Sequence, residues 1–253
     1  MRALRSHKTR EAEGCFFVEG IAPVWHALDS SFEVETILVA PDLLTSPGAA
    51  ERVAQIGSGH VEIVETTAAA FESISSRDNP QGLGAVVRAQ TSSLREVDPT
   101  PFAVGVHGVG NPGNLGTVIR TAVAFGGGGV IIAGSGTDPW HPECVKASMG
   151  GVFRTPLVRL TDPKDALDWA EEGGISTVAT SEHGSTGLKK AALRSPCVLW
   201  LGSEALGLPA EILEQADESV RIETGGAISS LNVATAAAIF IHAVAGRLAA
   251  DQT

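Results

Sequence analysis

The stretch FAVGVHGVGNPGNLGTVIRTA, residues 102–122, decides the fold class, because it runs from an apolar segment through a glycine-rich turn into a helix. Residues 102–108 form a nearly continuous apolar run, which is typical of a strand that is covered on both faces. After the turn, helical spacing places one apolar set on a single face: Leu115, Val118, Ile119, Ala122 and Val123. Arg120 lies about 140° around the helix from Leu115, so we expect its side chain to leave that face.

The same alternation of strands and helices continues towards the C-terminus. Further strands are predicted at 129–134, 155–160, 176–181, 197–202 and 219–223. Several of these are unbroken apolar runs, so the pattern predicts an α/β fold with a parallel sheet between two layers of helices. The last helix, residues 231–248, is apolar nearly all round, which is typical of a helix deep in the core or packed against a second subunit.

The N-terminal third predicts a smaller α/β unit. The polar segment TSSLREVDPTP (91–101) ends in prolines and separates this unit from the rest. We therefore expect an N-terminal domain over 1–92, a linker over 93–101 and a C-terminal domain over 102–253. In the N-terminal domain, strands are expected at 36–40, 61–65 and 84–89, and helices at 21–29, 47–57 and 67–75.

Composition excludes several classes of protein. With 18 basic and 29 acidic residues the net charge is −11, which excludes a generally basic nucleic-acid coat but not a local basic patch. Three cysteines far apart do not form a disulfide framework or a Cys-x-x-Cys site. No segment is typical of a signal peptide or membrane span, so we expect a cytoplasmic protein. His141 and Cys144 are too few to predict a metal site, and we expect none.

The turn GVGNPG (108–113) matches the glycine spacing of a dinucleotide site, which would make the protein an NAD(P)-dependent oxidoreductase. Such a site also needs an acidic residue near the end of the second strand to bind the ribose. That place reads IIAGSG (131–136) and has no carboxylate, and Pro112 removes one backbone N–H from the turn. The oxidoreductase remains an alternative.

Two further segments combine glycine or polar residues with element boundaries. In LGSEALGLP (201–209), two glycines flank Glu204 after a strand, which allows a ligand to lie against the backbone. In AISSLNVATAAA (227–238), Ser230 and Asn232 precede an apolar helix. Serine and asparagine often cap helices, and asparagine is a poor residue inside one.

Taken in order, three segments resemble the SpoU (TrmH) family of RNA ribose methyltransferases, within the SPOUT class. They are NPGNLGTVIRTA (111–122), LGSEALGL (201–208) and the stretch from Ile222 through SSLNVA (229–234). The resemblance extends to HKTREAEGCFFVEG (7–20), DNPQGLGAVV (78–87) and DPWHPECVKASMGGVFRTPL (138–157), and so covers nearly the whole chain. It implies a small N-terminal α/β substrate-binding domain, a C-terminal SPOUT domain with a trefoil knot, and a homodimer.

The resemblance also implies the chemistry, which is methyl transfer from S-adenosylmethionine to a ribose 2′-hydroxyl of RNA. The implied substrate is ribosomal RNA, 23S rather than transfer RNA, because the extra N-terminal domain suits the ribosomal members. We expect Arg120 to orient the target or stabilise the developing alkoxide, because a guanidinium is not readily deprotonated. The implied catalytic residues are Asn114, Arg120, Glu204, Ser230 and Asn232, and the implied cofactor contacts are Leu201, Gly202, Gly207, Ile222 and Leu231.

A basic N-terminal arm is the expected RNA contact, through Arg2, Arg5, Lys8 and Arg10. A second alternative to the methyltransferase is a non-catalytic RNA-binding paralogue, which the presence of Arg120, Glu204 and Asn232 disfavours.

Overall fold

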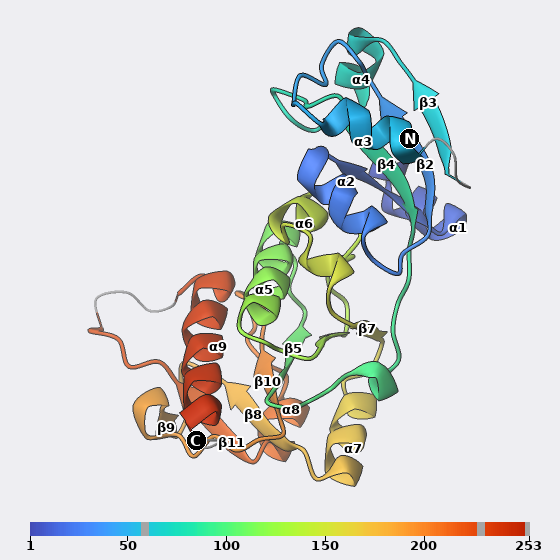
Figure 1. Cartoon of the computed structure of the whole chain (residues 1–253). Coiled ribbons are helices and arrows are strands. Elements are labelled where there is room, and N and C mark those ends of the chain that lie inside the picture. Colours follow the sequence, from blue (N-terminus) through green and yellow to red (C-terminus); the bar gives the residue numbers. More distant parts are fainter. Residues whose placement is uncertain (57–60, 227–230, 251–253) are drawn as a thin grey trace.

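Two β-sheets of different size organise the chain, whose computed structural model describes residues 1–56, 61–226 and 231–250 (Figure 1). The four-stranded sheet has the order β1-β4-β2-β3, and the seven-stranded sheet has the order β7-β6-β5-β10-β8-β11-β9. Each neighbouring pair in the larger sheet is parallel. The predicted α/β class with a parallel C-terminal sheet is therefore confirmed.

The smaller sheet is mixed: β4 pairs antiparallel with β1 and β2, whereas β2 and β3 are parallel. The predicted strands and helices of this part are present within two residues of their expected ends, and β1 and α1 are additional. The elements are η1 (Arg2–Arg5), α1 (His7–Glu13), β1 (Cys15–Glu19), α2 (Ile21–Leu28), β2 (Val34–Val39), α3 (Ala49–Ile56), β3 (Glu62–Glu65), α4 (Ala68–Ile74) and β4 (Leu83–Arg88).

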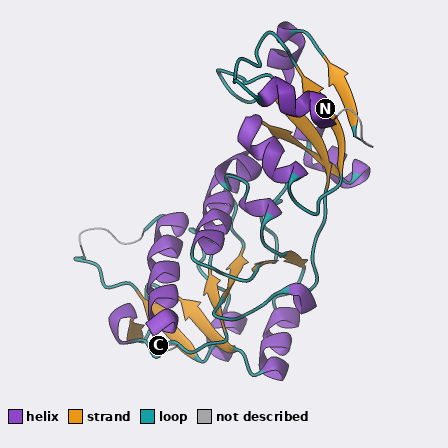
Figure 2. Ribbon diagram, viewed as in Figure 1, coloured by secondary structure: helices purple, strands orange, loops and turns teal. Residues whose placement is uncertain are grey.

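The larger sheet and its helices occupy the rest of the chain, where alternating helices and strands are visible in Figure 2. The elements are η2 (Leu94–Glu96), β5 (Ala103–His107), α5 (Pro112–Ala124), β6 (Val130–Ala133), α6 (Pro142–Ala147), η3 (Gly151–Phe153), β7 (Leu157–Leu160), α7 (Lys164–Gly173), β8 (Ser176–Thr180), β9 (Thr186–Gly187), η4 (Leu188–Lys190), β10 (Cys197–Leu201), α8 (Ala210–Gln215), β11 (Glu218–Arg221) and α9 (Val233–Ala250).

Helix α5 begins where the local sequence predicts. The side chain of Asn111 caps it by accepting the backbone N–H of Asn114 at 3.0 Å, and Pro112 occupies the first turn. The predicted apolar face is buried except for Val123, which is half-buried, and Leu115 and Ile119 are fully inaccessible. Arg120 is exposed, as its position around the helix predicts. The geometry of α5 therefore follows from capping and periodicity alone.

The larger sheet separates two hydrophobic clusters, one for each face. The first contains buried side chains of α5 and α9, such as Ile119 and Phe240, and continues into the N-terminal unit through Phe16. The second contains side chains of α7 and α8, such as Leu167 and Ile212. Helix α9 runs beside α5 in Figure 1 and packs against it. One face of α9 is thus in the core, as one of the two sequence interpretations has it.

The segment expected as a linker, residues 93–101, contacts the larger sheet, because Asp98 forms a bridge with Gly128 and Val97 is buried. The segment expected as a basic arm is folded into η1 and α1, and its Leu4 packs into a hydrophobic cluster.

The three cysteines are free and buried, in line with the expected absence of a disulfide framework in this chain. Burial and the neighbouring Glu35 carboxylate raise the pKa of the Cys15 thiol to about 11. Burial raises the pKa of the Cys197 thiol to about 12. These thiols stay protonated at neutral pH, so neither is an activated nucleophile.

Candidate functional site

The carboxyl ends of β5 and β10 lie side by side in the larger sheet, since the two strands are parallel neighbours. The loop after β5 leads into α5, and the loop after β10 contains Glu204. In open parallel sheets, the loops at this edge form the binding sites. The segments that the sequence singled out therefore meet at one edge of one sheet.

Three polar side chains from these segments form one hydrogen-bonded chain. The amide of Asn114 in α5 donates to the Glu204 carboxylate, although 90 residues separate them. The amide of Asn232 donates in turn to the Asn114 side-chain oxygen at 3.3 Å, across 118 residues. The oxygen of Asn232 also accepts the Ala234 N–H at 3.0 Å and so caps α9. Asn232 thus has both the capping role and a contact to the other two segments.

Arg120 lies two turns further along α5 and is exposed. The backbone of α5 at Arg120 packs closely against η3, since a Cβ on Gly151 of η3 would lie 3.4 Å from the Arg120 Cα. Among the described residues, no hydrogen bond or ion pair occupies the Arg120 guanidinium. Its five N–H donors are therefore free for a ligand.

The loop after β10 is a tight turn that depends on glycine. Ser203 and Gly207 exchange backbone hydrogen bonds at 3.2 and 2.9 Å. A Cβ on Gly202 would lie 2.2 Å from the carbonyl carbon of Gly207, so only glycine fits there. Gly207 has φ +67°, which also favours glycine. Gly202 thus allows the turn to close, and Gly207 leaves its own part of the backbone uncovered by a side chain.

The other residues expected to contact a cofactor differ in exposure. Leu201 is buried at the end of β10, and Ile222, directly after β11, is half-buried. Leu231 is 38% exposed. Ser230, expected on the substrate side, lies outside the described residues.

His107 occupies the carboxyl end of β5, although the sequence analysis gave it no role. Desolvation holds the pKa of its imidazole below the usual range, with Glu211 opposing that shift. Its ring lies against the backbone after β6, where a Cβ on Gly134 would be 2.6 Å from Nε2. Its place as the last residue of an apolar strand before a glycine turn was the signal available in the sequence.

The four N-terminal cations do not form one exposed group. Arg2, Arg5 and Lys8 are exposed, and Arg5 donates to the carbonyl oxygens of Ile74 and Ser75 at 3.0 and 2.6 Å. Arg10 is only 3% exposed and is paired with Asp138. The expectation that Arg10 contacts RNA is not met in this structure, because its guanidinium is already bound inside the protein.

Comparison with known proteins covers both parts of the chain. Residues 101–242 match the SpoU rRNA methylase family, and residues 1–85 match the MRM3-like substrate binding domain. The family match extends over more than half of the chain. The chain belongs to the SpoU rRNA methylase family. The resemblance drawn from the three sequence segments is thereby confirmed.

Individual relatives of this SpoU-family chain align with it along nearly its whole length. A 23S rRNA (uridine(2479)-2′-O)-methyltransferase of Streptomyces viridochromogenes is 31% identical, over 96% of this chain and 86% of the relative. The 23S rRNA (guanosine(2553)-2′-O)-methyltransferase RlmP of Bacillus subtilis is 26% identical, over 97% and 94%. An AdoMet-bound rRNA methyltransferase structure from Sinorhizobium meliloti superposes with TM-score 0.88 at 34% identity, covering 98% of this chain and 93% of that one.

No described helix of this SpoU-family chain has the length and apolar character needed to cross a membrane. Within the described ranges, no three His, Cys, Asp or Glu side chains are grouped as metal ligands.

Proposed function

We propose that this protein transfers a methyl group from S-adenosylmethionine to a ribose 2′-hydroxyl of ribosomal RNA. The observation that carries the proposal is the hydrogen-bonded chain of Asn114, Glu204 and Asn232 beside the glycine turn after β10. Methyl transfer needs the methyl donor and the ribose held close together in the right orientation, because positioning supplies much of the rate. The glycine turn and the polar side chains lie at one sheet edge, where they can hold the two.

The glycine turn fits the cofactor. Gly202 lets the turn close on Gly207, and the Cβ position of Gly207 is open, so an adenosine can lie against the backbone there and bind N–H and C=O groups with its polar edge. When bound, S-adenosylmethionine supplies the methyl electrophile. The backbone around Leu201, Ile222 and Leu231 would complete the cofactor site.

The polar chain and Arg120 would act on the RNA. Asn114, held between Glu204 and Asn232, has a fixed orientation at the start of α5. The free Arg120 guanidinium would bind the adjacent phosphate or stabilise negative charge on the 2′-oxygen as its proton leaves. The 2′-oxygen forms the new bond to carbon, the sulfur–methyl bond breaks, and the proton passes to water or a nearby base. Ser230 belongs to the same proposal from the sequence alone.

Ribosomal RNA, and 23S rRNA in particular, is the substrate class supported by the two named relatives and by the match of residues 1–85 to a substrate-binding domain. That activity would take place in the cytoplasm. We further propose an N-terminal domain over 1–92 and a C-terminal domain over 102–253, joined by residues 93–101. The C-terminal domain would contain a trefoil knot. The NAD(P)-dependent oxidoreductase is set aside, since the chain belongs to a methylase family.

A calorimetric and isotopic experiment tests the proposal. We expect saturable binding of S-adenosylhomocysteine, no binding of NAD, and transfer of labelled methyl groups to RNA from a strain that lacks this gene. Saturable NAD binding without any response to S-adenosylhomocysteine would contradict the proposal. Cofactor binding without methyl transfer to any RNA would instead favour the non-catalytic paralogue.

Replacing Gly202 with alanine should weaken cofactor binding while the protein stays folded. The new Cβ would overlap the Gly207 backbone and displace the turn. A misfit of this kind costs about 1–3 kcal/mol, which corresponds to a loss of affinity of roughly 5-fold to 150-fold. Calorimetry with S-adenosylhomocysteine measures it. The matched control is Gly225→Ala, where a Cβ has open space. Wild-type affinity in Gly202→Ala would remove the turn from the cofactor site.

The exposed face of α9 supports the homodimer. Ile239 is 38% exposed, and Phe125, directly after α5, is 41% exposed beside the His242 ring, with ring centroids 5.5 Å apart. Apolar side chains grouped in this way favour burial against a second copy.

We expect light scattering to give twice the chain mass of 26.0 kDa, and Ile239→Glu to give monomers because it places a charge in the buried interface. A wild-type particle of 26.0 kDa at micromolar concentration would exclude this dimer.

A further inference from the structure

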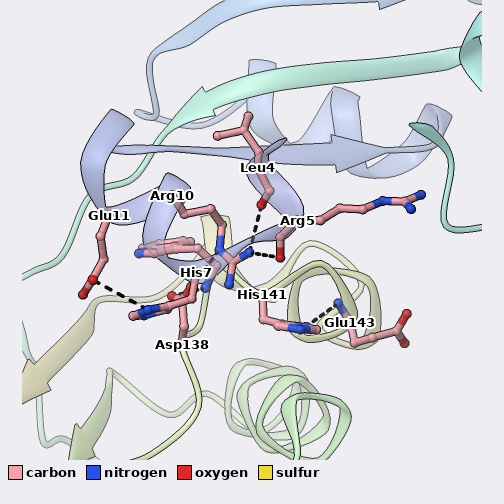
Figure 3. Close-up of polar contacts among 9 residues, drawn as sticks. Leu4, Arg5, His7, Arg10, Glu11, Asp138, His141 and Glu143 are labelled. Atoms are coloured by element: carbon pink, nitrogen blue, oxygen red, sulfur yellow. Dashed lines mark hydrogen bonds and ion pairs between the residues drawn. The ribbon is translucent and has the colours of Figure 1, made fainter. Parts of the chain in front are cut away.

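A buried ion pair joins the N-terminal helix to the C-terminal part of the chain (Figure 3). The Nε of Arg10 in α1 donates to Oδ2 of Asp138 at 2.8 Å, and the two side chains are only 3% and 6% exposed. The same guanidinium donates through Nη1 to the carbonyl oxygens of Leu4 and Arg5 at 2.8 and 2.9 Å. Arg10 therefore has three acceptors, two from its own segment and one from a segment 128 residues away.

The second oxygen of Asp138 fixes an aromatic contact. Oδ1 accepts the backbone N–H of Trp140 at 2.9 Å. The Trp140 ring stacks on Phe16 of β1 with centroids 4.7 Å apart, and Phe32 meets Trp140 edge-on at 5.7 Å. The ion pair and the aromatic stack therefore act on the same side of the same junction. Together they join the smaller sheet to residues 138–140 by polar and aromatic contacts.

The residues just before Asp138 reach the candidate site. Thr137 donates its backbone N–H to Val109 at 3.0 Å and its hydroxyl to the Gly110 carbonyl at 2.6 Å. Residues 108–111 form the loop that opens α5, whose first turn carries Asn114. A short path thus leads from Arg10 by a hydrogen bond to Asp138, along the chain to Thr137, and by hydrogen bonds to the loop before α5.

An ion pair at this junction indicates a role in orientation more than in stability. Taking two charges out of water is costly, and apolar residues of similar volume often stabilise a fold as well or better. A guanidinium held by three oxygens, in contrast, admits one orientation. His141, which also lies beside Arg10, has its pKa lowered first by desolvation and then by that arginine, so it adds no competing positive charge at neutral pH. The junction is thus suited to fix direction rather than to add stability.

We propose that Arg10 and Asp138 are positioning residues for methyl transfer. They hold the RNA-binding N-terminal unit and the loop 108–111 in one relative orientation, so that RNA bound by the first presents its ribose to the site at the second. This inference rests on the proposed function. In this proposal Arg10 acts by its ion pair with Asp138 and not by binding a phosphate of the RNA.

The test compares Arg10→Met/Asp138→Asn with a double substitution of an exposed ion pair, Lys164→Met/Asp168→Asn in α7. The first variant leaves no unpaired buried charge, and asparagine can still accept the Trp140 N–H. We expect it to melt within a few degrees of the wild type and to bind S-adenosylhomocysteine equally well. Its single-turnover methylation of RNA should fall about tenfold or more, because misplacement by about 1 Å can cost up to 100-fold. The α7 control should keep the wild-type rate.

Amide hydrogen exchange provides a readout without activity. Exchange at residues 108–116 should become faster in Arg10→Met/Asp138→Asn, whereas α7 should be unchanged. If the variant melts like the wild type and also methylates and exchanges like it, the pair is only structural and the proposal is wrong. If the wild type itself transfers no methyl group, the proposed function fails, and the exchange result still decides whether the coupling exists.

Arg10→Lys decides the case in which the double variant does not fold. Lysine keeps the buried charge, but its ammonium cannot reproduce the fixed fork that meets Asp138, Leu4 and Arg5 together. We expect a folded protein with a reduced single-turnover rate and unchanged cofactor affinity. A wild-type rate in this variant would overturn the proposal.

Discussion

Arg120→Ala is expected to lower the single-turnover rate of methyl transfer by about 100-fold or more, the effect of losing one preorganised charge at a reacting centre. Folding and S-adenosylmethionine affinity should be nearly unchanged, because the side chain is exposed and, among the described residues, makes no hydrogen bond. The measurement is a quench experiment with enzyme in excess over RNA, alongside thermal melting and calorimetry.

Arg120→Lys is the matched control for charge. It should recover part of the rate, because lysine keeps the positive charge but lacks the planar pair of donors. If Arg120→Ala keeps more than about half of the wild-type rate, the role assigned to this arginine is wrong. If it unfolds the protein, Arg120 has a structural partner and the exposed position is misleading.

Asn114→Asp should reduce methyl transfer by a similar factor, about 100-fold, the order seen when one oriented donor is lost from a reacting centre. The substitution keeps the shape of the side chain but replaces the amide that donates to Glu204 with a second carboxylate. Two adjacent negative charges repel, so the link between the loops after β5 and β10 breaks. The oxygen that accepts from Asn232 is retained, which limits the change to one contact.

Glu204→Gln is the matched control for Asn114→Asp. A glutamine oxygen can still accept from Asn114, so the contact survives and the negative charge is removed. We expect a loss several times smaller than that of Asn114→Asp if Glu204 acts by orienting Asn114. Equal losses in the two variants would show that the reaction uses the negative charge of Glu204 as well as the hydrogen bond. Wild-type activity in Asn114→Asp would remove the polar chain from the mechanism.

Periodicity and capping were enough to predict most of the architecture. The strand at 102–108, the glycine turn and the apolar face of α5 all follow from local sequence, and the structure has β5 and α5 where expected. Local rules work there because each element is specified by its own residues. They did not predict α1, because its buried residue is Arg10, and a buried arginine cannot be distinguished from a solvated one by hydrophobic pattern.

The candidate site could be predicted only in part. The three segments were identified from their order and residue types, yet the contact of Asn232 with Asn114 spans 118 residues and requires the complete topology. The pairing of Arg10 with Asp138 was missed for the same reason: Arg10 was expected in an RNA-binding arm, and Asp138 was noted only as part of a segment that resembles the family. Nothing in local sequence indicates which distant carboxylate meets which cation. Long-range polar contacts are thus the part that pattern analysis does not supply.

The position of the transferred methyl group tests the central claim most directly. RNA from a strain lacking this gene is incubated with the wild-type protein and S-adenosylmethionine labelled in the methyl group, and is then hydrolysed with alkali. Methylation of a ribose 2′-oxygen blocks cleavage at that nucleotide, so the account predicts label in one alkali-stable dinucleotide that maps to a single position in ribosomal RNA. Label released in a mononucleotide, which would place the methyl group on a base, would contradict the account.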